Sequence, residues 1–95
     1  MTATGKCVRA IIRGRVQGVG YRAWCAQAAS ARGLSGWVRN CRSGEVEALF
    51  SGEEKMVDTM LAAVWEGPRF ARVLEVEVNS EATVPGEGFE IRGTV

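Results

Sequence analysis

Two hydrophobic periodicities alternate along this chain, and their order is what most restricts its fold. In Cys7 to Arg13 (CVRAIIR), Glu45 to Ser51 (EVEALFS) and Arg72 to Val78 (RVLEVEV), apolar residues stand at every second position. This spacing predicts β-strands with one buried face and one face in water. Leu34 to Asn40 (LSGWVRN) indicates a further strand, joined to Glu45–Ser51 in a hairpin by the turn sequence NCRSG.

Two other segments have the spacing of helices. Tyr21 to Arg32 is rich in alanine and is followed by Gly33, which predicts a helix with a glycine at its carboxyl end. Ser51 to Trp65 places apolar residues three or four positions apart, and Gly67-Pro68 stops it. Ser51 and Glu54 match a capping box, so we expect this helix to start at a capping serine.

The resulting order is strand, helix, strand, strand, helix, strand, with a short last strand around Phe89 and Ile91. Strands that alternate this cleanly belong to a sheet covered on one face only. We therefore expect a four- to five-stranded antiparallel sheet with both helices on one face, an α+β sandwich of the ferredoxin-like type. The length of 95 residues suits one domain, residues 1–95.

Composition excludes several classes of chemistry. There is no histidine, so schemes that need a histidine base or a Cys–His pair do not apply. The three cysteines, Cys7, Cys25 and Cys41, form no CxxC pair, which argues against a zinc site and for a reducing compartment. The start, MTATGKC, has no apolar signal core, and no apolar run reaches the roughly 20 residues of a membrane helix. We expect a cytoplasmic protein that uses no metal, no cofactor and no membrane.

Charge is divided unevenly between the two halves of the chain. Residues 45–95 hold all eleven acidic residues, whereas residues 1–44 hold none. The cations of residues 1–44 are Lys6, Arg9, Arg13, Arg15, Arg22, Arg32, Arg39 and Arg42. Two interpretations remain open from charge alone: the basic half binds an anionic partner, or the two halves pair within one fold.

The stretch GRVQGVGYR, Gly14 to Arg22, joins the first strand to the first helix. It places arginines and no carboxylate at the positive end of a helix dipole, which is unfavourable unless an anion binds there. Its glycines allow the backbone to turn tightly and to approach a ligand. Successive N–H groups would form an anion-holding nest, and Arg22 would grip two oxygens of a phosphate.

Other interpretations of this stretch are weaker or less specific. A glycine-rich turn with solvated arginines is the simplest alternative. The chain has no GxxxxGK[ST] and no GxGxxG after the first strand, so neither nucleotide-binding motif is supported. Cys7 and Arg13 have the cysteine–five–arginine spacing of cysteine-dependent phosphatases, but the residues between them predict a strand and not a loop.

GRVQGVGYR, then GWVRN (Gly36 to Asn40) and GPRFARV (Gly67 to Val73), resemble the acylphosphatase family in order and spacing over nearly the whole chain. The resemblance implies hydrolysis of the carboxyl–phosphate bond of an acyl phosphate, without metal or cofactor. It implies that Arg22 binds the phosphoryl group and that Asn40 orients the attacking water. It further implies a phosphate-binding set of Arg15, Val16, Gln17, Gly18, Val19, Gly20 and Arg22.

These implied roles agree with the chemistry of the residues. Phosphoryl transfer needs alignment and charge stabilisation more than covalent catalysis. The neutral amide of Asn40 orients water without repelling an anion, although Asn at a strand end is also a common turn residue. For Gln17 we expect contact through its backbone. Inorganic phosphate should be the product of the reaction and an inhibitor of the enzyme. We expect the protein to be a monomer.

The sequence departs from the commoner family pattern at three places: Cys41 follows the asparagine, Ser43-Gly44 replaces Asp-Gly, and the chain ends GTV without an aromatic residue. Cys41 would affect the rate of the reaction or the sensitivity of the protein to oxidation. The hairpin turn and the last residues would affect stability.

Two rival functions are weaker. One is a domain serving carbamoyl transfer or enzyme maturation, which in this family occurs fused to larger enzymes. The other is an RNA-binding module on the open sheet face, which would need stacked aromatic residues where Arg9, Ile11 and Arg13 are expected. We interpret Trp24, Trp37 and Trp65 as core or rim residues and expect no nucleic-acid partner.

Overall fold

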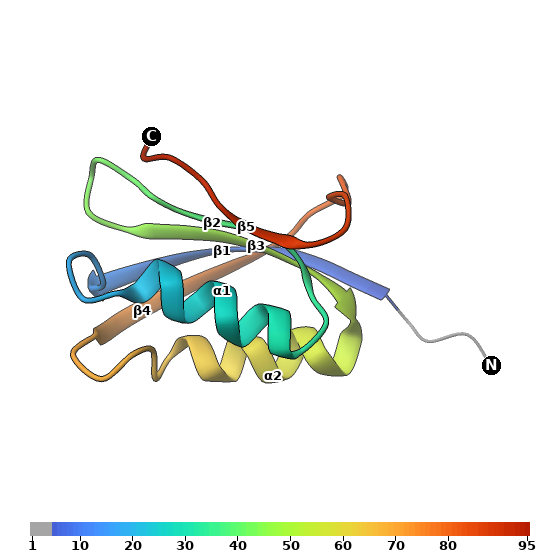
Figure 1. The fold of residues 1–95 in the computed structure, drawn as a ribbon, viewed down its shortest axis with the longest axis horizontal. Helices are drawn as coiled ribbons and strands as arrows, with labels where there is room; N and C mark the ends of the chain where they lie inside the picture. The colour runs from blue at the N-terminus through green and yellow to red at the C-terminus, as the bar shows by residue number, and fades with distance from the viewer. Residues whose placement is uncertain (1–4) are drawn as a thin grey trace.

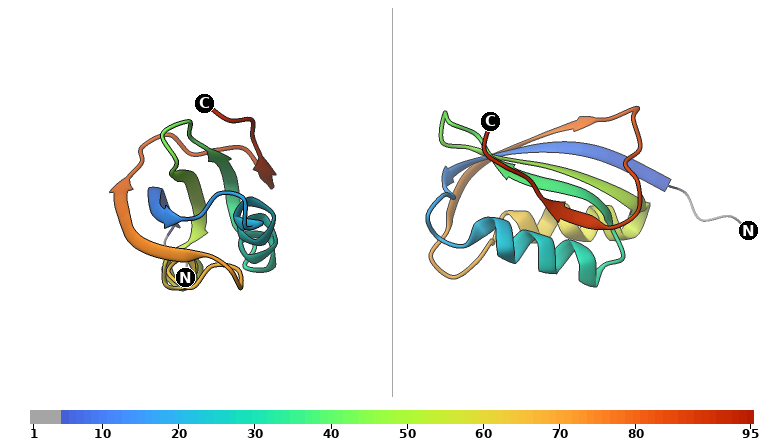
Figure 2. Two further views of the ribbon diagram at one scale, coloured as in Figure 1. Left: turned by 90° about the vertical axis from the view of Figure 1, so that its left-hand side faces the viewer. Right: turned by 45° about the horizontal axis from the view of Figure 1, so that its top comes forward.

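The computed structural model describes residues 5–95 and has two layers, a five-stranded sheet and a pair of helices (Figure 1). Both helices cover the same face of the sheet, as predicted (Figure 2). None of the helices in this part of the chain is long and apolar enough to cross a membrane. The elements are β1 (Gly5–Arg15), α1 (Tyr21–Ala31), β2 (Ser35–Asn40), β3 (Val46–Glu53), α2 (Glu54–Val64), β4 (Arg72–Ser80) and β5 (Phe89–Ile91).

The sheet has the strand order β4-β1-β3-β2-β5. The pairs β1–β3, β1–β4 and β2–β3 are antiparallel, as expected, but β5 runs parallel to β2. The prediction of an entirely antiparallel sheet was therefore wrong at its edge. The long connection from β4 carries the chain across the sheet, so that the last strand enters beside β2 in the parallel direction.

The core lies between the sheet and the helices. Alternation in β1 buries Val8, Ala10 and Ile12, and turns Arg9 and Arg13 to the open face. The central strand β3 is buried on both faces, because Glu47 and Leu49 are also covered on the open side. The core is completed by Val16, Tyr21, Cys25, Ala29, Leu34, Val38, Val46, Ala48, Phe50, Val57, Met60 and Val64.

The capping box predicted for α2 is absent. Ser51 is a buried residue of β3, paired with Cys7 of β1 and Ser35 of β2, and the strand continues to Glu53. The helix begins three residues later than predicted, at Glu54, with Glu53 as its N-cap and no side-chain cap hydrogen bond. Pairing on both sides of β3 holds Ser51 in the sheet and outweighs its local capping preference.

Candidate active site

A pocket of about 290 Å³ opens where the β1–α1 loop, the end of β2 and strand β5 meet. It brings together Arg22 and Asn40, the two residues predicted to be catalytic. Within residues 5–95, neither of their side chains has a hydrogen-bond or ion-pair partner. The pocket is lined by Gly18, Gly20, Tyr21, Arg22, Ala23, Asn40 and Ile91.

The loop that precedes α1 turns through two glycines in the left-handed region, Gly18 at φ 75° and Gly20 at φ 77°. Gly20 is the N-cap of α1, with no side-chain cap and no acidic residue in the first turn. In the described chain, the backbone N–H groups of residues 16–20 donate to no backbone carbonyl. Such a helix start, with open N–H groups and an arginine at hand, has the features that an anion requires.

The other residues of the predicted phosphate-binding set do not line the pocket with their side chains. Arg15 is exposed at the end of β1, and Val16 is buried in the core. Val19 packs against the core and is half-buried. What these positions offer an anion in this geometry is the backbone of the loop.

Gln17 makes contacts that the sequence did not predict. Its side-chain amide donates from Nε2 to the carbonyl oxygens of Cys41 and Glu45, each at 2.8 Å. These two carbonyls lie on opposite sides of the β2–β3 turn, directly after Asn40 and before Val46. These two hydrogen bonds of the Gln17 side chain join the glycine loop to the turn that carries Asn40.

The end of the chain holds Asn40 from the other side. The N–H of Val95 donates to the carbonyl of Asn40 at 3.1 Å, and the N–H of Arg42 donates to the carbonyl of Val95 at 2.7 Å. The N–H of Arg92 likewise donates to the carbonyl of Val38 at 2.9 Å. The backbone of Asn40 is therefore fixed while its side chain is left facing the pocket.

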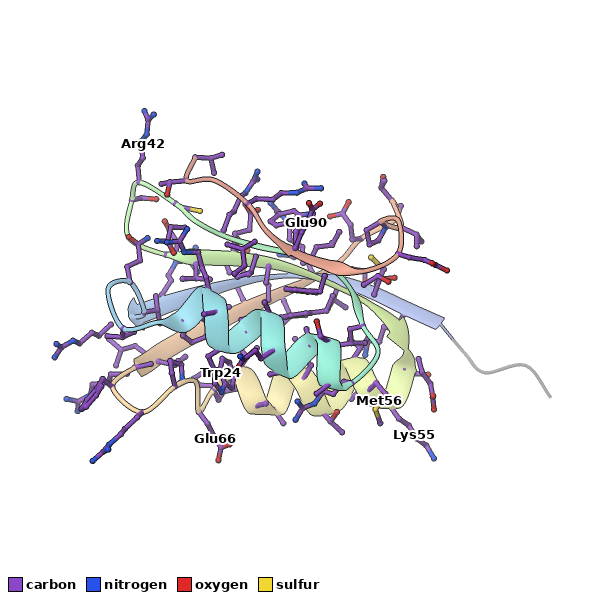
Figure 3. The ribbon with its side chains drawn as sticks, viewed as in Figure 1. Trp24, Arg42, Lys55, Met56, Glu66 and Glu90 are labelled. Atoms are coloured by element: carbon purple, nitrogen blue, oxygen red, sulfur yellow. The ribbon has the colours of Figure 1, made fainter. Side chains whose placement is uncertain are left out.

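Seven of the eight cations of the amino-terminal half separate into two groups; the eighth, Arg32, caps the far end of α1 and donates to the Thr59 hydroxyl and the Ala28 carbonyl. Lys6, Arg9, Arg13 and Arg39 form ion pairs with carboxylates of the other half, as the intramolecular interpretation of the charges predicted. Arg15, Arg22 and Arg42 have no carboxylate within 4.0 Å among residues 5–95. All three lie at the end of the molecule that carries the pocket, and Arg42 extends outward from the hairpin tip (Figure 3).

The cysteines take no part in the pocket. Burial raises the pKa of Cys25 to about 12. Burial, followed by the nearby Glu47 and Glu45 carboxylates, raises the pKa of the Cys41 thiol above its ordinary value. A thiol with a raised pKa is a poor nucleophile at neutral pH, so the position of Cys41 beside Asn40 does not make it reactive.

Sequence reasoning missed Tyr21, Ala23 and Ile91 as pocket residues. Ala23 could have been found, because it follows Arg22 in the first turn of a predicted helix. Ile91 had no comparable signal, because its place depends on the parallel pairing of β5 with β2, which sets Ile91 opposite Val38.

The fold and the pocket define a class: a ferredoxin-like α+β sandwich with an arginine, open backbone N–H groups and a side-chain amide at one helix start. The acylphosphatase family model matches residues 8–91. An acylphosphatase from Azorhizobium caulinodans is 54% identical over 86 residues, which cover 90% of this chain and 92% of that protein. The chain belongs to the acylphosphatase family, and it is an enzyme that hydrolyses acyl phosphates.

Solved structures agree with this assignment. The crystal structure of acylphosphatase from Bacillus subtilis superposes with a TM-score of 0.87 at 36% identity, covering 94% of this chain and 99% of that one. Full-length HypF, in a phosphate- and nucleotide-bound form, gives a TM-score of 0.90 at 27% identity. The match covers 99% of this chain but only 12% of HypF.

Proposed function

We propose that Arg22 and the loop of residues 15–20 bind the phosphoryl group, and that Asn40 orients the water that attacks phosphorus. The support for this assignment is one observation: a single pocket gathers an arginine without a partner among residues 5–95, a helix start with open N–H groups, and an amide held by its backbone. Arg22 and the N–H groups stabilise the charge on the phosphoryl oxygens in the transition state.

In the proposed reaction, the water oxygen forms a new bond to phosphorus as the bond from phosphorus to the acyl oxygen breaks. The carboxylate leaves with the electron pair of that bond, and it needs no acid because it is a weak base. The water proton passes to a phosphoryl oxygen, since no carboxylate or histidine lines the pocket. Asn40 contributes geometry, because its carbonyl oxygen accepts from water without adding charge.

The test is hydrolysis of benzoyl phosphate in EDTA by the wild type and two variants. We expect Asn40→Ala to lower kcat on the order of 10²- to 10³-fold while the inhibition constant of phosphate stays nearly unchanged. Arg22→Ala should lower kcat/KM at least as much and also weaken phosphate inhibition, because its partner is phosphate itself. Arg42→Ala is the matched control, an arginine that has no carboxylate partner in the described part of the chain and whose side chain does not line the pocket.

Two results would contradict the assignment of roles. Full activity of Asn40→Ala would exclude it as the residue that orients the water. Unchanged phosphate inhibition in Arg22→Ala would place the phosphate site elsewhere.

The RNA-binding alternative finds little support in the open sheet face. Arg9 and Arg13 are engaged by Glu47, Glu75 and Glu77. The ring of Trp37 lies under the guanidinium groups of Arg39 and Arg92, at 4.5 and 5.1 Å from its centroid. A base would have to displace these contacts, so we propose that no nucleic acid binds.

We further propose that the enzyme is a monomer of one domain and that it acts in the cytoplasm. Inorganic phosphate would be its product and a competitive inhibitor. The match to 12% of a longer protein, HypF, is consistent with the rival interpretation of a domain fused to a larger enzyme. That interpretation makes carbamoyl phosphate the substrate to compare with benzoyl phosphate. A clear preference for carbamoyl phosphate would favour a role in a maturation system.

A further inference from the structure

Strand β5 places an apolar side chain beside the proposed catalytic groups. Phe89 and Ile91 are two positions apart, so both lie on the helix-covered face, where the ring of Phe89 stacks on the core residue Phe50. Glu90, between them, lies on the opposite side of the sheet from the helices (Figure 3). Ile91 is 49% exposed in this edge strand and lines the pocket.

The pocket lining combines two kinds of surface. The loop and the helix start contribute Gly18, Gly20 and Arg22, where the phosphoryl group is proposed to bind. The exposed apolar surface comes from Ile91 and Ala23, since the ring of Tyr21 is buried and its hydroxyl donates to the carbonyl of Val64 at 2.7 Å. Arg22 is the only charged residue in the lining.

We propose that Ile91 forms the wall against which the acyl group of the substrate lies, and that it favours acyl phosphates with an uncharged aromatic or aliphatic acyl group. The proposal rests on the proposed function, because the phosphoryl group must bind at Arg22 for the acyl group to reach Ile91. An apolar acyl group removes surface of Ile91 from water on binding, whereas a second carboxylate there would lose hydration without gaining a partner.

The test compares benzoyl phosphate with acetyl phosphate, which has the same phosphoryl group but an acyl group too small to cover Ile91. In Ile91→Ala we expect kcat/KM for benzoyl phosphate to fall by about 10-fold or less. An apolar contact in an enclosed pocket changes kcat/KM by roughly 10- to 200-fold. We expect the low end of this range, because Ile91 is half exposed. The kcat/KM for acetyl phosphate should fall less, because its methyl group covers less of Ile91 than a benzoyl ring does. Val84→Ala is the matched control, an exposed aliphatic residue outside this pocket.

A charge introduced at the same position gives a second, independent measurement. Ile91→Lys should lower kcat/KM for benzoyl phosphate and raise it for succinyl phosphate, each relative to acetyl phosphate. The amine would meet the second carboxylate of the succinyl group beside the apolar surface of the pocket. This gain does not depend on the stability of the variant, because both ratios come from the same preparation.

The outcomes separate the two proposals. A change in the benzoyl-to-acetyl ratio in Ile91→Ala, together with the succinyl gain in Ile91→Lys, supports the acyl wall. An equal loss for both substrates in Ile91→Ala, or ratios that do not change, overturns it and leaves Ile91 a structural residue of β5. Loss of acetyl phosphate turnover in Asn40→Ala and Arg22→Ala tests the proposed function separately, whatever Ile91 does.

Discussion

At the scale of single residues, the arginines of this enzyme differ in what surrounds them and not in their own chemistry. Arg9 and Arg39 donate to Glu47, which is 5% exposed and accepts at 2.7 and 2.8 Å through its two oxygens. Arg22 faces a pocket and has no such acceptor in the described chain. The first two arginines are held by the fold, so the third is the one available to an anion.

Replacing Glu47 with Gln should lower stability. The two arginines would lose a charged acceptor in the least exposed part of the open face, which we expect to cost about 1–3 kcal/mol. We place the cost below the 3–5 kcal/mol of a fully buried pair, because the side chains of Arg9 and Arg39 are 41% and 27% exposed. Urea unfolding followed by circular dichroism measures this loss in the free energy of unfolding.

The matched control for Glu47 is Glu90→Gln, which breaks the exposed pair with Arg92 at 2.9 Å. Its unfolding midpoint should stay close to that of the wild type, because an exposed pair contributes little. If both variants unfold at the same urea concentration, burial of Glu47 does not contribute to stability as argued.

At the scale of elements, the site depends on a contact between a loop and a hairpin. Gln17 bonds to the carbonyls of Cys41 and Glu45, which fixes the turn carrying Asn40 against the β1–α1 loop. Gln17→Met keeps the size of the side chain and removes the donor. We expect kcat to fall on the order of 10-fold through misplacement of Asn40. Phosphate inhibition should change little, because the loop glycines and Arg22 remain.

This prediction is checked by measuring kcat and the phosphate inhibition constant of Gln17→Met together. Gln27→Met, on an exposed part of α1, is the control. A purely stabilising role for Gln17 would lower the unfolding midpoint and leave kcat unchanged, and that result would count against the positioning role.

The elements also show where sequence reasoning succeeds. The alternation of β1 and the glycine after α1 are local signals, and both elements lie close to their predicted places. The start of α2 was wrong because Ser51 is paired on both sides within the sheet. The direction of β5 and the contacts of Gln17 arise from residues far apart in the chain, and no local pattern encodes them.

At the scale of the whole molecule, the divided charge serves two purposes at once. Most carboxylates that pair with the amino-terminal cations lie on the open face or near its edges, where they neutralise Arg9, Arg13 and Arg39. Of the cations without a carboxylate partner among residues 5–95, Arg15, Arg22 and Arg42 lie at the end with the pocket, whereas Arg32 lies at the other end of α1. The sequence alone left these interpretations open, because composition does not tell which arginine faces which carboxylate.

One buried thiol should make the folded protein less stable at alkaline pH. The core thiol of Cys25, 0% exposed, has its pKa raised by burial from 9.0 to about 12. Above pH 9 the unfolded chain therefore loses this proton while the folded chain keeps it, so the native state binds more protons and stability falls as pH rises from 9 towards 12. One such group contributes a slope of up to about 1.4 kcal/mol per pH unit.

The alkaline slope can be assigned to Cys25 by substitution. In Cys25→Ala, the urea midpoint should be lower at pH 7, because the core loses volume, but it should decline less steeply between pH 9 and 10.5 than in the wild type. Cys7→Ala, at a less buried thiol, should change the slope less. Both are measured with a reductant present. Equal slopes in wild type and Cys25→Ala would show that this thiol ionises as readily in the folded chain as in the unfolded one. The alkaline loss would then have to come from another buried group, of which Tyr21, whose pKa burial also raises, is the first to test.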